Sequence, residues 1–147
     1  MILNMKRFLY ILTLSIAVLS GCKRESLPAD EICGEWESTD QSTGIHIYLS
    51  FKAGGTFRLY QSSRGMGYEV YCGRWSRKNG VLSGRYNDGE AWAYSYKTSI
   101  EGDILTMETV EQDSKTTGFK VCLIPEIVKN NATVAVKSRG DIRFPFL

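Results

Sequence analysis

The side chains that could carry chemistry in this chain are four cysteines and one histidine. The cysteines are Cys22, Cys33, Cys72 and Cys122, and the histidine is His46. Structural zinc sites combine closely spaced Cys and His ligands, and no C-x-x-C pair occurs in the sequence. It also has no G-x-S-x-G or H-E-x-x-H motif, and no pair of carboxylates that points to acid–base catalysis. We therefore predict no metal, no cofactor and no enzymatic activity.

Cys22 differs from the other cysteines because of the segment before it. Two basic residues are followed by the apolar run 8–19 and then by the small residues Ser20 and Gly21. This order is typical of a secretory signal peptide that is cleaved after a small residue. The apolar run is too short to cross a bilayer, which needs about 20 residues. We predict that residues 1–21 are removed and that the mature chain lies outside the cytoplasm.

The segment Leu19-Ser20-Gly21-Cys22 resembles the lipobox of bacterial lipoproteins, in which an apolar residue and two small residues precede a lipidated cysteine. The resemblance implies acyl chains such as palmitate on Cys22, with residues 22–32 as a polar tether. Two or more acyl chains give stable membrane anchoring. Lys23 stands where that family's inner-membrane retention signal is usually Asp, which favours the outer membrane. The alternative is an ordinary secretory signal with a chance cysteine.

The charge balance argues against a nucleic-acid-binding surface. The chain has 18 basic and 16 acidic residues, and the predicted signal peptide contains two of the basic ones and no acid. The mature part is therefore balanced, whereas nucleic-acid binding needs a clustered basic excess. Its length suits one domain. The expected partners are the membrane, through the lipid, and a small apolar ligand, but not nucleic acid.

Short alternating segments separated by tight turns dominate the sequence after the tether. Residues 45–51 alternate Ile, Leu and Phe with polar or aromatic side chains, which is typical of a strand with one buried face. Asn79-Gly80 is a strong signal for a two-residue hairpin turn. No helical period occurs after the signal peptide. Eight strands are expected, over residues 33–37, 45–51, 57–60, 68–75, 81–86, 91–98, 104–110 and 118–124.

Consecutive strands that are joined by short turns lie side by side and antiparallel. Eight such strands leave two exposed edges, and closing the sheet removes both. We predict an all-β fold, an eight-stranded antiparallel up-and-down barrel over residues 33–124, with an open sandwich as the second choice. In the C-terminal extension, residues 125–147, either a last strand packs on the outside of the barrel or the tail is loosely ordered. The apolar end at 142–147 argues against free disorder.

Several short motifs resemble those of the lipocalins. Gly34-Glu35-Trp36 is similar to the G-x-W motif that opens their first strand. Residues 51–57, Gly73-Arg74-Trp75 and residues 102–105 resemble hairpins of small lipocalin-like lipoproteins of Bacteroidetes-type bacteria. The resemblance implies a barrel with a cavity for a small apolar ligand. It also implies that Trp36 plugs the closed end under a basic residue, for which Lys120 is the nearest candidate.

Aromatic side chains are the candidates for contacting such a ligand. They are Trp36, Tyr71, Trp75, Trp92, Tyr94 and Tyr96. The last three share one face of the strand predicted over 91–98. If that face points inward, the barrel is packed; if it points outward, a cavity remains and the aromatic row becomes an interaction surface. We favour the inward orientation, because core aromatics are commoner.

The first and last strands of a closed barrel are neighbours, so Cys33 and Cys122 could lie within bridging distance. A disulfide there would close a long loop and stabilise the fold by up to about 4–5 kcal/mol in the chain-entropy account. Two buried thiols are the competing expectation. On the outer face, the alternation places His46, Glu35 and Glu37 in solvent.

These expectations lead to two hypotheses about function. The first is a membrane-anchored, lipocalin-like lipoprotein of the cell envelope that binds a small apolar ligand, with residues 62–67 and 112–117 as entrance loops. The second is a structural lipoprotein whose packed barrel binds envelope proteins or glycans through its outer face. The orientation of the strand over 91–98 discriminates between them.

Overall fold

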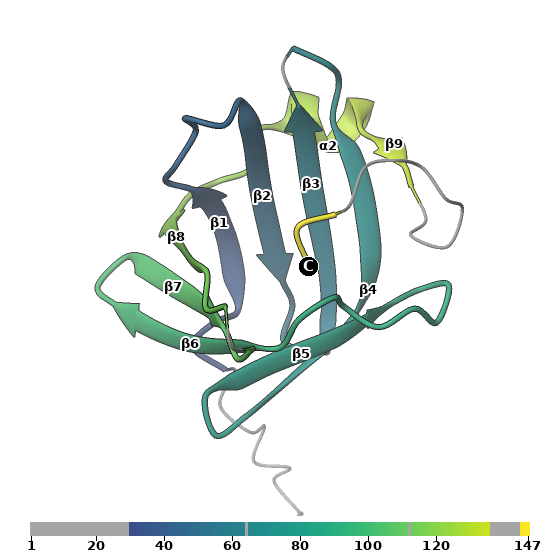
Figure 1. The fold of residues 1–147 in the computed structure, drawn as a ribbon. Coiled ribbons are helices and arrows are strands. Elements are labelled where there is room, and N and C mark those ends of the chain that lie inside the picture. The colour runs from purple at the N-terminus through teal and green to yellow at the C-terminus, as the bar shows by residue number, and fades with distance from the viewer. Residues whose placement is uncertain (1–29, 64, 112, 136–144) are drawn as a thin grey trace, which may run out of the picture.

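The computed structural model describes residues 30–63, 65–111, 113–135 and 145–147, so the predicted signal peptide and Cys22 lie outside the described residues. Eight strands follow one another along the chain (Figure 1), and a short helix and a final short strand come after them. They are β1 (Gly34–Ser38), β2 (Ile45–Phe51), β3 (Thr56–Ser63), β4 (Glu69–Lys78), β5 (Val81–Tyr86), β6 (Tyr96–Glu101), β7 (Ile104–Thr109), β8 (Thr116–Val121), α2 (Glu126–Asn131) and β9 (Thr133–Val134).

The eight longer strands close into a barrel. Each pairs antiparallel with the next, and β1 also pairs antiparallel with β8, where Trp36 lies opposite Val121. In Figure 1, β1 to β4 stand upright as one wall, and β5 to β7 cross in front of its lower part. Because the last strand returns to the first, no long edge is left unpaired. The predicted eight-stranded up-and-down barrel is confirmed.

The hairpin between β4 and β5 shows how local sequence sets the register. Asn79 and Gly80 both have positive φ, at 52° and 76°, and Lys78 pairs with Val81 across them. Two positive φ values define the turn type whose twist matches that of the flanking strands. The turn that was predicted from Asn79-Gly80 is therefore present, and it aligns the longest strand, β4, with β5.

Alternate side chains of the strands fill the barrel. Trp36 is 3% exposed, and Phe57 and Phe119 are almost fully buried. The remaining buried members of the same cluster are Ile32, Ile47, Leu49, Phe51, Leu59, Tyr71, Leu82, Tyr86, Trp92, Tyr96, Leu105, Met107 and Leu147. Eight strands leave a lumen just wide enough for such side chains, so the interior is a packed aromatic and aliphatic core.

The strand predicted over residues 91–98 is wrong in its position. β6 begins only at Tyr96, and before it a single bridge joins Ala91 to Arg85. A turn, in which the Glu90 N–H donates to the Asp88 carboxylate at 3.1 Å, delays the return of the chain to the sheet. Without a continuous ladder, strict alternation is lost. Trp92 and Tyr96 are buried, as favoured, but Tyr94 between them is 42% exposed.

Arg77, and not Lys120, fastens the segment before β1 to the barrel. Arg77 binds Asp30 at 3.0 Å, Glu31 at 3.1 Å and the Thr98 hydroxyl at 2.8 Å. These contacts join the segment before β1 to β4 and β6. Lys120 is half-exposed and faces the Glu37 carboxylate at 3.6 Å, so the prediction that it packs over the first-strand tryptophan is wrong.

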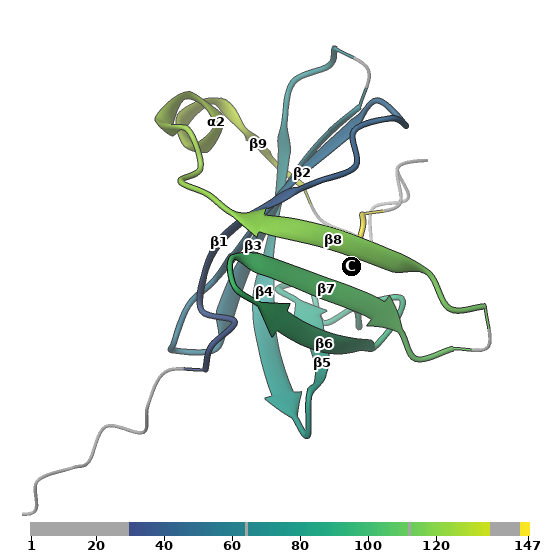
Figure 2. The ribbon, with the colours of Figure 1, turned by 90° about the vertical axis from the view of Figure 1, so that its left-hand side faces the viewer.

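We predicted no helix after the signal peptide. This prediction is also wrong, because α2 packs outside the barrel. Figure 2 shows this helix beyond the end of β8. Val128 of α2 and Ile124 bury against Tyr48, Tyr60 and Val70, which are outward-facing side chains of β2, β3 and β4. No helix among the described residues is long and apolar enough to span a membrane.

The chain after α2 returns to the sheet as β9, which runs parallel to β4. A last strand is therefore present, as one of the two alternatives expected, but at Thr133 and Val134 it extends the sheet at the edge of β4 and does not pack on the outer face. In the first part of the extension, residues 125–135, the ordered alternative therefore holds, because this part is packed against the barrel wall.

Glu35 ties α2 to the barrel and is not the solvated residue that the alternation predicts. Its side chain is 15% exposed, and it binds Lys129 at 2.9 Å and accepts the Ile124 N–H at 2.8 Å. Burial alone raises the pKa of this carboxyl, but the hydrogen bonds from Lys129 and Ile124 outweigh it and leave the pKa below the ordinary value of 4.5. The folded chain therefore stabilises the ionised form of the Glu35 carboxyl.

Glu35→Gln should destabilise the fold at neutral pH and have less effect in acid. A lowered folded-state pKa stabilises the fold above about pH 4.5, and this stabilisation is lost as pH falls through the lower folded-state value. We expect a loss of about 1 kcal/mol at neutral pH. Urea denaturation between neutral pH and pH 3 measures it. The control is Glu126→Gln, whose carboxylate is 78% exposed; equal pH profiles for both variants would contradict this role of Glu35.

Candidate functional site

The inner side of the barrel wall holds a piece of the C-terminal extension. Leu147 is fully buried, and the Phe146 ring stacks on Tyr96 and packs edge-on against Phe119, with ring centres 5.7 and 5.5 Å apart. Figure 1 shows residues 145–147 in front of β2 and β3, on the side that β5 to β7 enclose. The barrel thus accepts an apolar segment that is not part of its own strands.

Polar groups of the barrel meet the main chain of this segment. The Phe146 N–H donates to the Gln61 side-chain oxygen at 2.9 Å, and the Tyr96 hydroxyl donates to the Phe146 carbonyl at 2.9 Å. The Tyr86 hydroxyl donates to the main-chain oxygen of Leu147. Burial raises the pKa of both tyrosines. They are therefore neutral donors, and the site combines an apolar surface with two fixed donors and one acceptor.

The structure divides the six aromatic candidates into three groups. Trp36 and Tyr71 belong to the core, where the Trp36 indole donates to the Ile32 carbonyl at 2.9 Å and the Tyr71 hydroxyl to Glu69 at 3.1 Å. Tyr96 contacts the bound C-terminal segment. The other three lie together in a cleft of the barrel wall.

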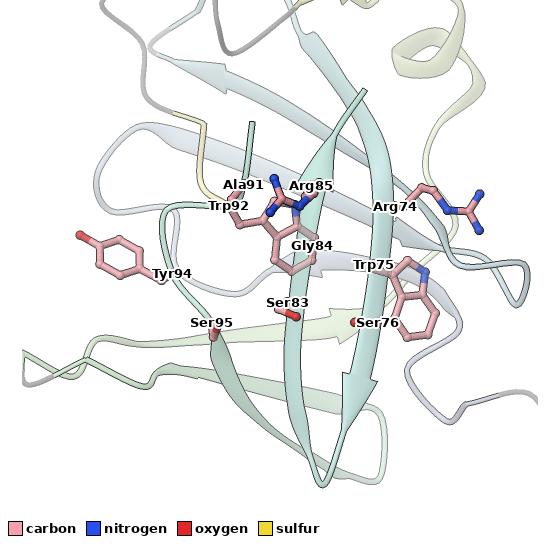
Figure 3. A pocket seen from close by; sticks show the side chains of 10 residues that line it. All are labelled: Arg74, Trp75, Ser76, Ser83, Gly84, Arg85, Ala91, Trp92, Tyr94 and Ser95. Atoms are coloured by element: carbon pink, nitrogen blue, oxygen red, sulfur yellow. The ribbon is translucent and has the colours of Figure 1, made fainter. Parts of the chain in front are cut away.

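This cleft opens where β5 and β6 separate. The two strands share only the pairs Val81 with Lys97 and Leu82 with Tyr96. Beyond them a cleft of about 410 Å³ remains. Figure 3 shows its lining residues: Arg74, Trp75, Ser76, Ser83, Gly84, Arg85, Ala91, Trp92, Tyr94 and Ser95. Aromatic, hydroxyl and guanidinium groups therefore meet at a break in the wall.

Trp92 closes the bottom of this break. Its indole lies on Gly84, where an added Cβ would come within 2.4 Å of the ring, and it packs edge-on against Phe57 at 5.1 Å between ring centres. Its Nε1–H is buried without an acceptor. A buried donor without a partner is costly. Sequence alternation identified Trp92 but could not show that it seals a gap between two strands.

The alternation predicted a solvated His46, but its ring is held by neighbouring side chains. Its Nε2 lies 2.8 Å from Glu37 Oε1, and its Nδ1 lies 2.7 Å from the Tyr68 hydroxyl. The Tyr48 ring packs on the imidazole at 4.6 Å between centres. Burial, together with the nearby Tyr68 and Glu37, raises the pKa of Tyr48 to about 12. The network joins the outer faces of β1 and β2 to the start of β4.

The cysteines of the described residues are free thiols. Cys33, Cys72 and Cys122 are each partly buried. For Cys33 and Cys122, the structure therefore has the second of the two expected alternatives, thiols in place of a disulfide. The strands themselves are neighbours as expected, since the Cys122 N–H donates to the Glu35 carbonyl at 3.0 Å. Burial and the carboxylates of Glu37 and Glu35 raise the pKa of Cys122 to about 11. This thiol is protonated and unreactive at neutral pH.

Within the described residues, no group of three Cys, His, Asp or Glu side chains could hold a metal ion. No protein-family model and no curated protein matches the chain. The class of protein is therefore defined by the fold and the site alone: a closed eight-stranded antiparallel up-and-down barrel whose lumen binds an apolar segment.

Proposed function

We propose that this protein is a cell-envelope lipoprotein, anchored by acyl chains on Cys22, whose lipocalin-like barrel binds a small apolar ligand. The proposal rests on the position of Phe146 and Leu147 inside the barrel wall, where barrel side chains form hydrogen bonds with the main chain of this segment. The ligand occupies the place that these two residues take in the structure. The C-terminal segment and the ligand therefore compete.

The chemistry of that place defines the ligand. Tyr86 and Tyr96 present two neutral hydroxyl donors, and Gln61 presents an acceptor, beside aromatic surface from Phe119. Small-molecule sites in proteins are mostly apolar with a few fixed polar groups. The best fit is an apolar molecule with a carbonyl or similar oxygen at one end.

The anchor keeps this site near the membrane. Residues 22–32 can span at most roughly 40 Å when fully extended. The barrel on such a tether stays within one protein diameter of the lipid surface, where apolar molecules accumulate. The outer membrane is the proposed location, because Lys23 stands where the inner-membrane retention signal of such lipoproteins is usually Asp.

Leu147→Asp should strengthen binding of an apolar probe to the barrel. A buried carboxylate without a partner is strongly unfavourable, so the substitution expels the C-terminal segment. The probe is the uncharged fluorophore N-phenylnaphthylamine, titrated into the lipid-free chain that begins at Lys23. We expect the apparent affinity for the probe to rise roughly tenfold, because the state in which the C-terminal segment has left the barrel becomes dominant. The matched control is Leu123→Asp, since Leu123 is 89% exposed.

The burial of Trp92 and Tyr96 favours the second function, a packed barrel that binds envelope proteins or glycans through its outer face. The same titration separates the two. If neither the parent chain nor Leu147→Asp binds the probe while both stay folded, the lumen does not hold a ligand. The exposed Tyr94 and the cleft around it would then be the surface to test.

A further inference from the structure

The outer face of the barrel carries a groove that the proposed ligand site does not use. The register places Ser50, Arg58 and Cys72 side by side across β2, β3 and β4. Lys52 lines the groove from the turn after β2, and Lys129 lines it from α2. The groove encloses about 480 Å³, which is the size of a small-molecule pocket. Figure 2 shows α2 standing outside the barrel.

The groove is cationic. Lys52, Arg58 and Lys129 line it with a single carboxylate, that of Glu35. This carboxylate already binds Lys129 at 2.9 Å and the Ile124 N–H at 2.8 Å. In the part of the chain that the structure describes, neither Lys52 nor Arg58 takes part in an ion pair. Lys52 also lies near enough to Glu35 to help lower the pKa of that carboxyl, so three cations in the groove share one carboxylate.

Elsewhere on the barrel, Arg77 lies between the carboxylates of Asp30 and Glu31, and Lys120 faces Glu37. The mature sequence has equal numbers of basic and acidic residues. Arg74 and Arg85 of the cleft between β5 and β6 also take part in no ion pair among the described residues and donate to main-chain carbonyls instead. The groove differs from that cleft in gathering three cations, Lys52, Arg58 and Lys129.

The guanidinium of Arg58 lies beside Tyr60, two residues along β3. A hydrogen bond with the Tyr60 hydroxyl raises the pKa of Arg58. Tyr60 is itself only 2% exposed and is packed in the cluster under α2. The exposed guanidinium presents its remaining N–H groups as a planar donor set, which matches phosphate oxygens.

We propose that this groove binds a small molecule with a phosphate group, which Arg58 and Lys52 contact while its body lies along Tyr60 and Cys72. The volume of the groove exceeds that of a bare phosphate ion, so a phosphate ester fits it better. A soluble ester and a phospholipid headgroup share this chemistry. The site is separate from the barrel lumen, because Arg58 faces outward whereas Leu147 lies inside.

The test is a two-dimensional NMR titration of the full chain in a neutral detergent with glycerol phosphate. We expect shifts at Lys52, Arg58, Cys72 and Lys129, and an affinity about tenfold weaker in Arg58→Gln, as for loss of one charge-assisted hydrogen bond. Lys97→Gln removes an equal charge from the exposed face of β6 and should bind like the parent.

A second arm adds phosphatidic acid to the same detergent micelles. Arg58-dependent shifts with the lipid alone identify a headgroup as the ligand, and shifts with glycerol phosphate identify a soluble ester; both support the groove. Equal affinity of Arg58→Gln and Lys97→Gln, or shifts spread over all surface lysines, would overturn it. None of these results bears on apolar probe binding in the lumen, so the two proposals fail separately.

Discussion

Trp36→Ala should lower the free energy of unfolding by about 3–5 kcal/mol, because it empties the space of a large aromatic ring in the core. Trp36 is 3% exposed and lies opposite Val121 at the seam that closes the barrel. Its indole also donates to the Ile32 carbonyl at 2.9 Å, and Ile32 is fully buried. The substitution therefore leaves both a cavity and a carbonyl without its donor at the point where the first and last strands meet.

Urea denaturation of the lipid-free chain measures this loss. Trp36→Phe keeps much of the packing and removes only the indole donor, so it should cost less than the alanine variant. Tyr94→Ala is the exposed aromatic control, because Tyr94 is 42% exposed. A Trp36→Ala chain that is as stable as Tyr94→Ala would show that the seam does not depend on this side chain.

Gly73→Ala should have the second large effect, roughly 3 kcal/mol or more, through overpacking. An added Cβ would lie 2.0 Å from the Arg85 carbonyl oxygen and 2.8 Å from both the Tyr86 Cα and the Phe57 ring. Two of these three neighbours are main-chain atoms of β5, so no rotation of a side chain relieves the clash. The β4–β5 pair itself must move apart.

Gly54→Ala is the matched control for this prediction. Its added Cβ would have no atom within 4 Å, and it lies in the turn between β2 and β3. We expect a change within about 0.5 kcal/mol, as for an ordinary surface substitution. Denaturation midpoints that fall equally for Gly54→Ala and Gly73→Ala would contradict the close approach of β4 and β5.

Much of the barrel can be predicted from the sequence because its signals are local. The alternation over residues 45–51 matches β2, and Asn79-Gly80 matches the turn before β5. The strand over 91–98 fails because alternation alone cannot show where the chain rejoins the sheet. The turn at Asp88 and the single bridge at Ala91 delay β6 to Tyr96.

The candidate site depends on contacts between distant segments, and these leave no periodic signal. Nothing in the alternation around Gln61 or Tyr86 shows that they bind the main chain of Phe146 and Leu147. The same holds for Glu35, whose partner on α2 is more than ninety residues away in the sequence. The helix itself is short, with one buried residue, Val128, so it has too few turns to show a helical period.

Native mass spectrometry of the protein, purified gently from its source cells, tests the central claim most directly. The account predicts a discrete added mass that disappears on denaturation and that the Leu147→Asp chain retains at higher occupancy, because the competing segment has left the barrel. The contradictory result is the bare protein mass for both chains under several mild conditions. The barrel would then be a packed module, and its partners would bind the outer face.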